Sequence, residues 1–192
     1  MINSALNDKL MQFFNEALAM EHAAEDRIHA RVNETPVEQT RQQLQYHLEE
    51  TRQQQGRLRE LVTNMGGSPT TANASLPSIK PATADTITGM VKETAKSVAS
   101  EESRQTLDAE KELMRIKEDA IIENAEIVSY KLLMEMTDKA GLKDASAKLQ
   151  QSLQEEVAMA NFIACNAPLI LSLLWPKLEA PAHGKQERIA KV

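Results

Sequence analysis

Four long stretches of the sequence repeat apolar residues at helical spacing, and each stretch carries an ionisable side chain within its apolar stripe. A charge on the buried face of a helix is costly unless something binds it. Of the 192 residues, 42% are hydrophobic but only 3% are aromatic, which is typical of one helical domain packed with aliphatic side chains. We therefore expect an all-α protein whose core contains ionisable groups.

Capping and breaking residues set the expected helix boundaries. The helices are expected from Ser4 to Asn33, from Pro36 until Gly66, from Arg104 to Ala140 and from Lys143 to Cys165. Thr35 can cap the second helix, with Pro36 at its first position and Glu38 three residues after the cap. Gly141 is a natural residue to follow the third helix, and Pro168 is expected to end or kink the fourth.

The segments between and after these helices define the domain organisation. Residues 66–84 lack periodicity and are rich in Gly, Ser, Pro, Thr, Asn and Ala, which predicts a crossover linker. Residues 86–99 are weakly amphipathic and predict a short extra helix across the bundle. Residues 1–166 then form one four-helix bundle, and residues 167–192 form a C-terminal extension with an apolar run, APLILSLLW, and a polar tail expected to be mobile.

Charge and cysteine usage exclude several classes of function. A formal net charge of -6 and a sequence pI near 5.3 argue against sequence-independent nucleic-acid binding, which needs a basic surface. The start of the chain does not resemble a secretory leader, and we expect no apolar run of the roughly 18–20 residues that span a bilayer. Cys165 is the single cysteine, so no internal disulfide can form. These features predict a cytoplasmic protein without a membrane span.

Helical phase selects the polar side chains that share the apolar faces. His47 and Glu50, three residues apart, meet on one face of the second helix, and Glu123 and Glu126 do so on the third. The candidate metal-ligating residues are Glu21, His47, Glu50, Glu123, Glu126 and Glu156.

Two neighbouring acids on the fourth helix, Glu155 and Glu156, are alternative candidates for its metal ligand. Helical phase favours Glu156, which follows the apolar stripe. The spacing from Glu21 to Glu50 equals that from Glu126 to Glu155, and a duplicated helical hairpin would produce this repeat and favour Glu155. We give phase more weight, because loop lengths drift while a ligand must face inward.

Five carboxylates and one imidazole in a bundle core would repel one another, and two divalent cations would relieve that repulsion. Oxygen donors with one nitrogen favour iron or manganese, whereas closed zinc sites favour Cys and His. Carboxylate-bridged sites in helix bundles take one Glu from each of two helices and a Glu-x-x-His pair from each of the others. Here His47 precedes Glu50, and Met159 stands where a second His would follow Glu156, so Glu123 could replace the missing ligand.

Three segments resemble a known family: QYHLEETRQQQGRLREL (45–61), IENAEIVSY (122–130) and LQQSLQEEVAMA (149–160). They are similar to the YciE/YciF-like branch of ferritin-like stress proteins, over residues 10–163. The resemblance implies a ferritin-like, rubrerythrin-like four-helix bundle, often a homodimer, with a dinuclear metal centre and expression under osmotic or oxidative stress.

The resemblance also assigns residues by position. The matching ligand positions are Glu21, His47, Glu50, Glu123 and Glu126, together with the pair Glu155 and Glu156 without a choice between them. The family commonly has Glu-His-x-Glu on the third helix, and this chain has Asn124 in place of that histidine. Tyr130 continues the same stripe, and we expect a boundary tyrosine with its hydroxyl at the bundle surface in preference to a hydrogen bond with a ligand.

Two classes of function fit these observations. The first is a ferritin-like stress-response protein whose two Fe or Mn ions act in peroxide, dioxygen or iron chemistry, as in a di-iron or di-manganese oxidoreductase or peroxidase. The alternative is a non-catalytic helical scaffold that has lost its metal and binds a protein partner through residues 167–178. Iron storage in a ferritin-type shell is a weaker third hypothesis, because nothing in the sequence specifies a cage.

Overall fold

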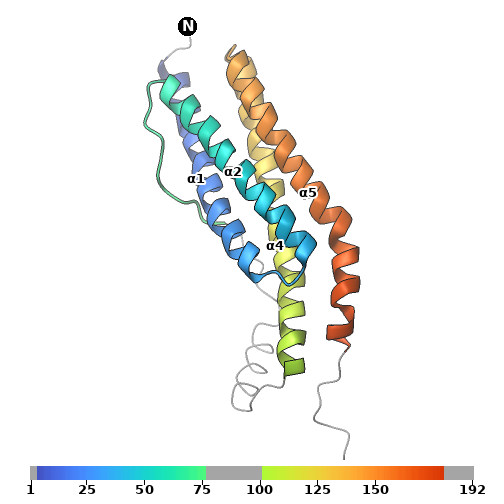
Figure 1. Ribbon diagram of the computed structural model, residues 1–192. Coiled ribbons are helices and arrows are strands. Elements are labelled where there is room, and N and C mark those ends of the chain that lie inside the picture. The colour runs from blue at the N-terminus through green and yellow to red at the C-terminus, as the bar shows by residue number, and fades with distance from the viewer. Residues whose placement is uncertain (1–3, 77–100, 180–192) are drawn as a thin grey trace, which may run out of the picture. The chain divides into compact units, whose positions relative to one another are not determined.

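The computed structural model describes residues 4–76 and 101–179, and every regular element within them is an α-helix. The helices are α1 (Ser4–Glu34), α2 (Glu38–Asn64), α4 (Glu101–Lys139) and α5 (Lys143–Leu178) (Figure 1). The prediction of an all-α fold with four long helices is confirmed. The short helix expected at 86–99, the last part of the linker and the tail from residue 180 lie outside the described residues.

The chain forms two compact units. The first contains residues 1–77 and 119–165, and the second contains residues 78–118 and 166–192. Each of α4 and α5 therefore has one part in the first unit and the other part in the second. All the candidate ligands lie in the first unit, so the site can be described within that unit alone.

Helix direction in the first unit explains why a long linker is needed. The Asn7 side chain, near the start of α1, donates to the Met65 carbonyl just after α2, so these helices form an antiparallel hairpin (Figure 1). Near the end of α1, Arg31 pairs with Asp119 of α4, whereas Glu21, earlier in α1, contacts Tyr130. Thus α4 is antiparallel to α1 and parallel to α2, and a parallel pair needs a long return connection.

Residues 67–76 begin this return as an extended segment along α1. The Thr70 amide donates to Asn15 Oδ1 at 2.7 Å, and the Ala74 amide donates to the Ala19 carbonyl at 2.8 Å. The segment therefore leads the chain from the first turns of α1 towards its later turns. Such hydrogen bonds satisfy backbone groups that no regular element pairs.

The helices of the first unit bury one shared apolar core. It contains Leu10, Phe14 and Leu18 of α1, Leu58, Leu61 and Val62 of α2, Tyr130 and Leu133 of α4, and Ala145 and Leu149 of α5. Burial of these faces supplies the main stabilising term and fixes the rotation of each helix. The rotation in turn decides which polar side chains point inward.

The start of α2 differs from the prediction. Its N-cap is Val37, and no side chain caps it. The Thr35 amide still donates to the Arg31 carbonyl, so Thr35 closes the last turn of α1 and cannot begin α2. The Thr35 hydroxyl instead accepts a bond from the Val37 amide at 3.3 Å. Pro36 consequently lies in the turn between the two helices.

Pro168 does not end α5, which continues through Pro168 and Pro176 to Leu178. A proline in a helix interior removes one backbone hydrogen bond. Ile170 and Leu174, only 3% and 2% exposed, bury their side chains on the continued helix, and this burial offsets the lost bond. The apolar C-terminal run is therefore helical.

The apolar part of α5 is also longer than expected. No charged residue lies between Glu156 and Lys177, and the neutral asparagines within this stretch do not interrupt it. By length and composition α5 is apolar enough to cross a membrane, with a mean hydropathy of 1.9 in its most apolar window, of which 22% is buried. The expectation that no stretch reaches this length was wrong, although core helices of soluble proteins meet the same criterion.

Candidate metal centre

Five of the six candidate ligands are buried together between the four helices of the first unit. Their exposed fractions are 1% for Glu21, 1% for His47, 3% for Glu123, 3% for Glu126 and 1% for Glu156. The sixth, Glu50, has a side chain that is 15% exposed. On each helix the candidate ligands thus share the face that the apolar residues bury, and this places four acids and one imidazole in the core.

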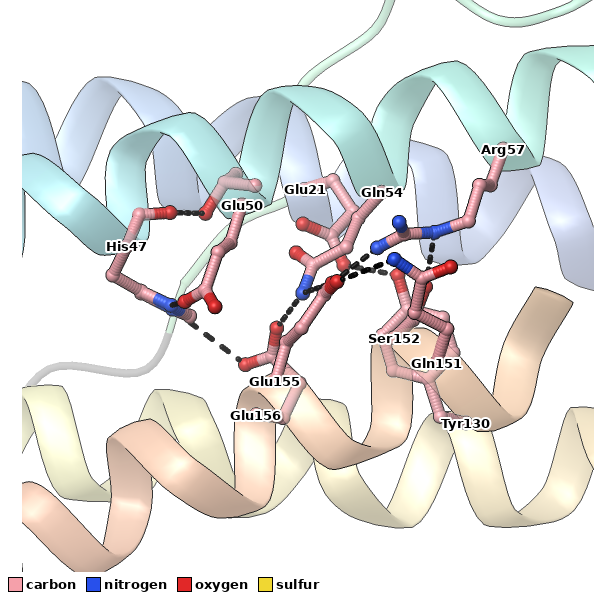
Figure 2. A network of polar contacts seen from close by, with 11 residues as sticks. Glu21, His47, Glu50, Gln54, Arg57, Tyr130, Gln151, Ser152, Glu155 and Glu156 are labelled. Carbon is pink, nitrogen blue, oxygen red and sulfur yellow. Dashed lines mark hydrogen bonds and ion pairs between the residues drawn. The ribbon is translucent and has the colours of Figure 1, made fainter.

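His47, Glu123 and Glu156 form the tightest group of candidate ligands. His47 Nε2 lies 3.3 Å from Glu123 Oε2. It also lies 3.8 Å from Glu156 Oε2 (Figure 2). One potential ligand atom from each residue lies within 4.8 Å of the others. Atoms at this spacing can contact one common cation, which would sit among α2, α4 and α5.

Glu50 lies on the other side of the His47 ring. His47 Nδ1 and Glu50 Oε2 are 3.0 Å apart, so the ring donates this hydrogen bond through Nδ1 (Figure 2). The bond leaves Nε2 facing the buried acids, which is the arrangement in which a carboxylate orients a metal-binding histidine. The structure therefore places Glu50 behind His47, outside the group of converging ligand atoms.

The protonation of His47 depends on its carboxylate neighbours. Burial alone would lower the pKa of His47, but the carboxylates of Glu123 and Glu50 beside its ring, with the charge of Glu156, raise this pKa to about 11. The imidazole is therefore a cation in the metal-free protein. A metal ion bound at Nε2 has to displace that proton.

Glu21 and Tyr130 form a buried pair on the side of the cluster opposite to His47. The Tyr130 hydroxyl donates to Glu21 Oε1 at 2.5 Å, and Tyr130 is only 1% exposed (Figure 2). The expectation of a hydroxyl at the bundle surface was wrong, because the core packs around the whole ring. Burial raises the pKa of Glu21 to about 8, although the Tyr130 hydrogen bond acts in the opposite direction.

Glu126 and Glu156 lie close enough to the other acids to repel them. Burial, followed by the charges of Glu156 and Glu21, holds the pKa of Glu126 well above its usual range. Burial, followed by the charge of Glu123, likewise raises the pKa of Glu156 well above its usual range. Glu21, Glu126 and Glu156 therefore resist ionisation unless a cation lies among them.

Unpaired oxygen atoms provide the test of whether the residues fit a metal. Glu123 Oε2, Glu126 Oε1 and Glu156 Oε2 are buried and accept no hydrogen bond, although Glu123 Oε2 forms an ion pair with His47 Nε2 at 3.3 Å. Leaving a buried carboxylate oxygen unpaired is costly, and hard divalent cations are the natural partners of such oxygens. The donor set therefore fits a carboxylate-rich site for a hard divalent cation.

The two acids left open on α5 have different partners. Glu155 pairs with Arg57 and accepts a hydrogen bond from Gln151 at 3.1 Å (Figure 2). Glu156 is buried and points between the helices towards His47. The structure therefore brings Glu156 into the cluster, whereas Arg57 neutralises Glu155 outside it.

Comparison with known proteins identifies the family. The model of a domain of unknown function, DUF892, matches residues 5–172. The chain belongs to the DUF892 family. A search of curated protein sequences gives no match.

Solved structures share the fold of this DUF892 protein at low sequence identity. A ferritin-like, diiron-carboxylate protein from Bacillus anthracis is 13% identical with a TM-score of 0.65, covering 86% of this chain and 99% of that one. The Escherichia coli stress protein YciF is 20% identical with a TM-score of 0.59, covering 88% and 99%. A Desulfovibrio desulfuricans bacterioferritin, whose structure describes a diiron site, is 15% identical with a TM-score of 0.60, covering 98% and 97%. The ferritin-like fold and the resemblance to YciF-like proteins are confirmed.

Sequence reasoning missed a second group of polar residues in this DUF892 protein. Asp119, one helical turn before Glu123, pairs with Arg31 at 2.8 Å and with Arg27 at 3.1 Å. Arg31 is fully buried, so this pair fixes α1 against α4 next to the site. The spacing of Asp119 from Glu123 was a usable signal, because residues four apart share a helix face.

Gln54 is the other residue that the sequence analysis missed. It is fully buried, and its Nε2 donates to Glu156 Oε1 at 2.5 Å and to Glu155 Oε2 at 3.1 Å (Figure 2). Gln54 follows Glu50 by four residues and His47 by seven, so helical phase places all three on one face. A search restricted to charged residues and histidine cannot find it.

Proposed function

We propose that this protein is a ferritin-like stress-response protein that holds two Fe or Mn ions and uses them to consume peroxide or dioxygen. The observation that carries the proposal is the set of buried carboxylate oxygens that accept no hydrogen bond, two of which lie 3.3 Å and 3.8 Å from His47 Nε2. The relatives named as ferritin-like diiron-carboxylate protein and as stress protein support it. When bound, such ions would supply the two electrons that reduce peroxide to water.

The protein's own residues would bind and orient the ions. His47 Nε2 with Glu123 and Glu156 would hold one ion, and Glu21 and Glu126 would help to hold the other. Glu50 and Tyr130 would orient His47 and Glu21 through the hydrogen bonds described above. The apolar residues around the cluster would limit access of water.

Peroxide consumption tests this proposal directly. Protein loaded with Fe2+ without oxygen should oxidise about two Fe2+ ions for each H2O2 that it consumes, because the reduction of H2O2 to water takes two electrons. The reaction is followed by stopped-flow absorbance and by assay of residual peroxide. Glu123→Gln should slow the reaction at least about tenfold, whereas Glu110→Gln, an exposed acid on the same helix, should not change it. Equal rates for wild-type and Glu123→Gln proteins contradict the proposal.

A second candidate function is favoured by the exposed apolar end of α5. Leu169, Leu171, Leu173 and Trp175 are 39–54% exposed on the described surface. In this alternative the bundle is a scaffold that associates through residues 167–178, with a second copy of the chain as the partner. It predicts that Leu173→Glu/Trp175→Glu halves the mass in light scattering, and that the protein binds no metal.

A further inference from the structure

The side chain of Gln54 combines full burial with an unpaired oxygen. Gln54 Oε1 is buried and has no hydrogen-bond partner, in contrast to its Nε2, which bonds two carboxylates. Among the described residues, five buried side-chain oxygens lack a partner, and all but Thr40 Oγ1 belong to Gln54 or to a candidate ligand. The unpaired amide oxygen therefore has the same feature as the carboxylate oxygens of the site.

The chemistry of its neighbours fixes the orientation of this amide. Only the NH2 group of an amide donates hydrogen bonds, and the adjacent acceptors are the carboxylates of Glu155 and Glu156. The reversed amide would place its oxygen against two carboxylate oxygens, which repel it. The oxygen must therefore point away from Glu155 and Glu156 and remain in the buried interior, where the side chain lies among the residues of the site (Figure 2).

The position of Gln54 relative to Glu156 indicates which ion it faces. Glu156 Oε2 is on the His47 side, 3.8 Å from Nε2. Glu156 Oε1 is the atom that Gln54 contacts. The amide thus lies at the end of the Glu156 carboxylate turned away from His47, so the ion that it would face is not the one that His47 Nε2 would hold.

Charge balance explains why an amide suits this position better than another acid. Glu21, Glu123, Glu126 and Glu156 carry four negative charges when ionised, which two divalent cations neutralise. Glu155 is already neutralised by Arg57. A further carboxylate would add uncompensated buried charge, whereas an amide carbonyl offers a hard oxygen without charge.

We propose that Gln54 Oε1 is a ligand of the second metal ion. This inference rests on the proposed two-ion site and adds a seventh side chain to the predicted set. Two features carry it, namely the buried unpaired oxygen and the hydrogen bonds that turn this oxygen away from Glu155 and Glu156. The amide also supports Glu156 through Nε2, so the test must separate the two contributions.

Metal titration of full-length variants makes this separation. Wild type, Gln54→Leu and Gln54→Glu are titrated with Mn2+, and electron paramagnetic resonance distinguishes paired from single ions. In Gln54→Leu the second ion should bind at least about tenfold more weakly, and the signal of paired ions should be lost. Gln54→Glu keeps an oxygen donor but loses the NH2 group and adds a negative charge beside Glu155 and Glu156, so it should retain the paired signal, with the second ion bound more weakly than in wild type and more tightly than in Gln54→Leu.

Gln55→Leu is the matched control. Gln55 is also a buried glutamine of α2, but its amide bonds the Glu21 carbonyl and Glu25. This variant should bind both ions, and thermal unfolding without metal checks that each variant is folded. Two ions bound to Gln54→Leu at wild-type affinity would overturn the inference, as would equal impairment of Gln54→Leu and Gln54→Glu. Wild-type protein that binds no ion would overturn both this inference and the proposed function.

Discussion

Metal-free protein is expected to lose stability as the pH rises from about 5 to about 9, while stabilisation by added Mn2+ grows over the same range. The buried cluster causes both trends. The folded-state pKa of Glu21 is raised from 4.5 to about 8, and that of His47 from 6.5 to about 11. The folded-state pKa values of Glu126 and Glu156 are raised as well.

The direction of the change in stability with pH follows from proton linkage. A group whose pKa is higher in the folded state contributes stability that is complete below its unfolded-state pKa and is lost as the pH rises through its folded-state pKa. For Glu21 this interval runs from 4.5 to about 8, and for His47 from 6.5 to about 11. We expect a combined loss of at least about 2 kcal/mol, since one pKa unit corresponds to about 1.4 kcal/mol.

Metal binding reverses this dependence because the ligands must be deprotonated to bind. Each ion at about a hundredfold excess over its dissociation constant adds about 2.7 kcal/mol, and the gain grows as protons leave the site. Urea unfolding followed by circular dichroism at a series of pH values, with chelator or with Mn2+, measures both trends. A metal-free stability that stays flat or rises over this range would show that Glu21, Glu126, Glu156 and His47 are not coupled as described.

Glu126→Gln is expected to stabilise the metal-free protein and to weaken metal binding. At pH 8 the buried acid must either hold a proton or carry a charge beside Glu156 and Glu21, and an amide of similar size avoids both costs. We expect a gain of at least about 2 kcal/mol in the free energy of unfolding at pH 8. The gain should shrink as the pH falls and be small near pH 4, where the unfolded acid, with an ordinary pKa of 4.5, is also largely protonated.

Two comparisons make this result specific to the site. Glu110→Gln, at an exposed position of α4, should change stability by less than about 0.5 kcal/mol. With Mn2+ present the order should reverse, and wild type should become more stable than Glu126→Gln because it holds the second ion more tightly. A loss of stability in metal-free Glu126→Gln would mean that the carboxylate makes a favourable interaction in the fold.

Helical periodicity predicts most of this fold because a helix exposes or buries side chains by phase alone. The phase of Glu21, His47, Glu123, Glu126 and Glu156 relative to their apolar neighbours was sufficient to select the residues that the structure buries together. It also favoured Glu156, whereas the repeated spacing favoured Glu155, which the structure pairs with Arg57. Loop lengths carry less physical constraint than the inward direction of a buried side chain.

Tertiary packing decided the features that the sequence could not predict. Pro168 lowers helix propensity locally, but Ile170 and Leu174 are buried further along the same helix. Tyr130 has a polar hydroxyl that favours a boundary position, yet Glu21 accepts its hydrogen bond inside the core. In each case the deciding contact lies outside the local sequence pattern.

Metal analysis of untagged protein, purified without chelator and then reconstituted with Fe2+ or Mn2+, tests the central claim most directly. The same analysis of a Glu21→Ala/Glu126→Ala variant is the necessary comparison. About two ions per wild-type chain, lost in the variant, is the expected result for a dinuclear carboxylate site. Substoichiometric metal that both proteins retain equally would contradict the claim and would favour a scaffold that acts through the apolar end of α5.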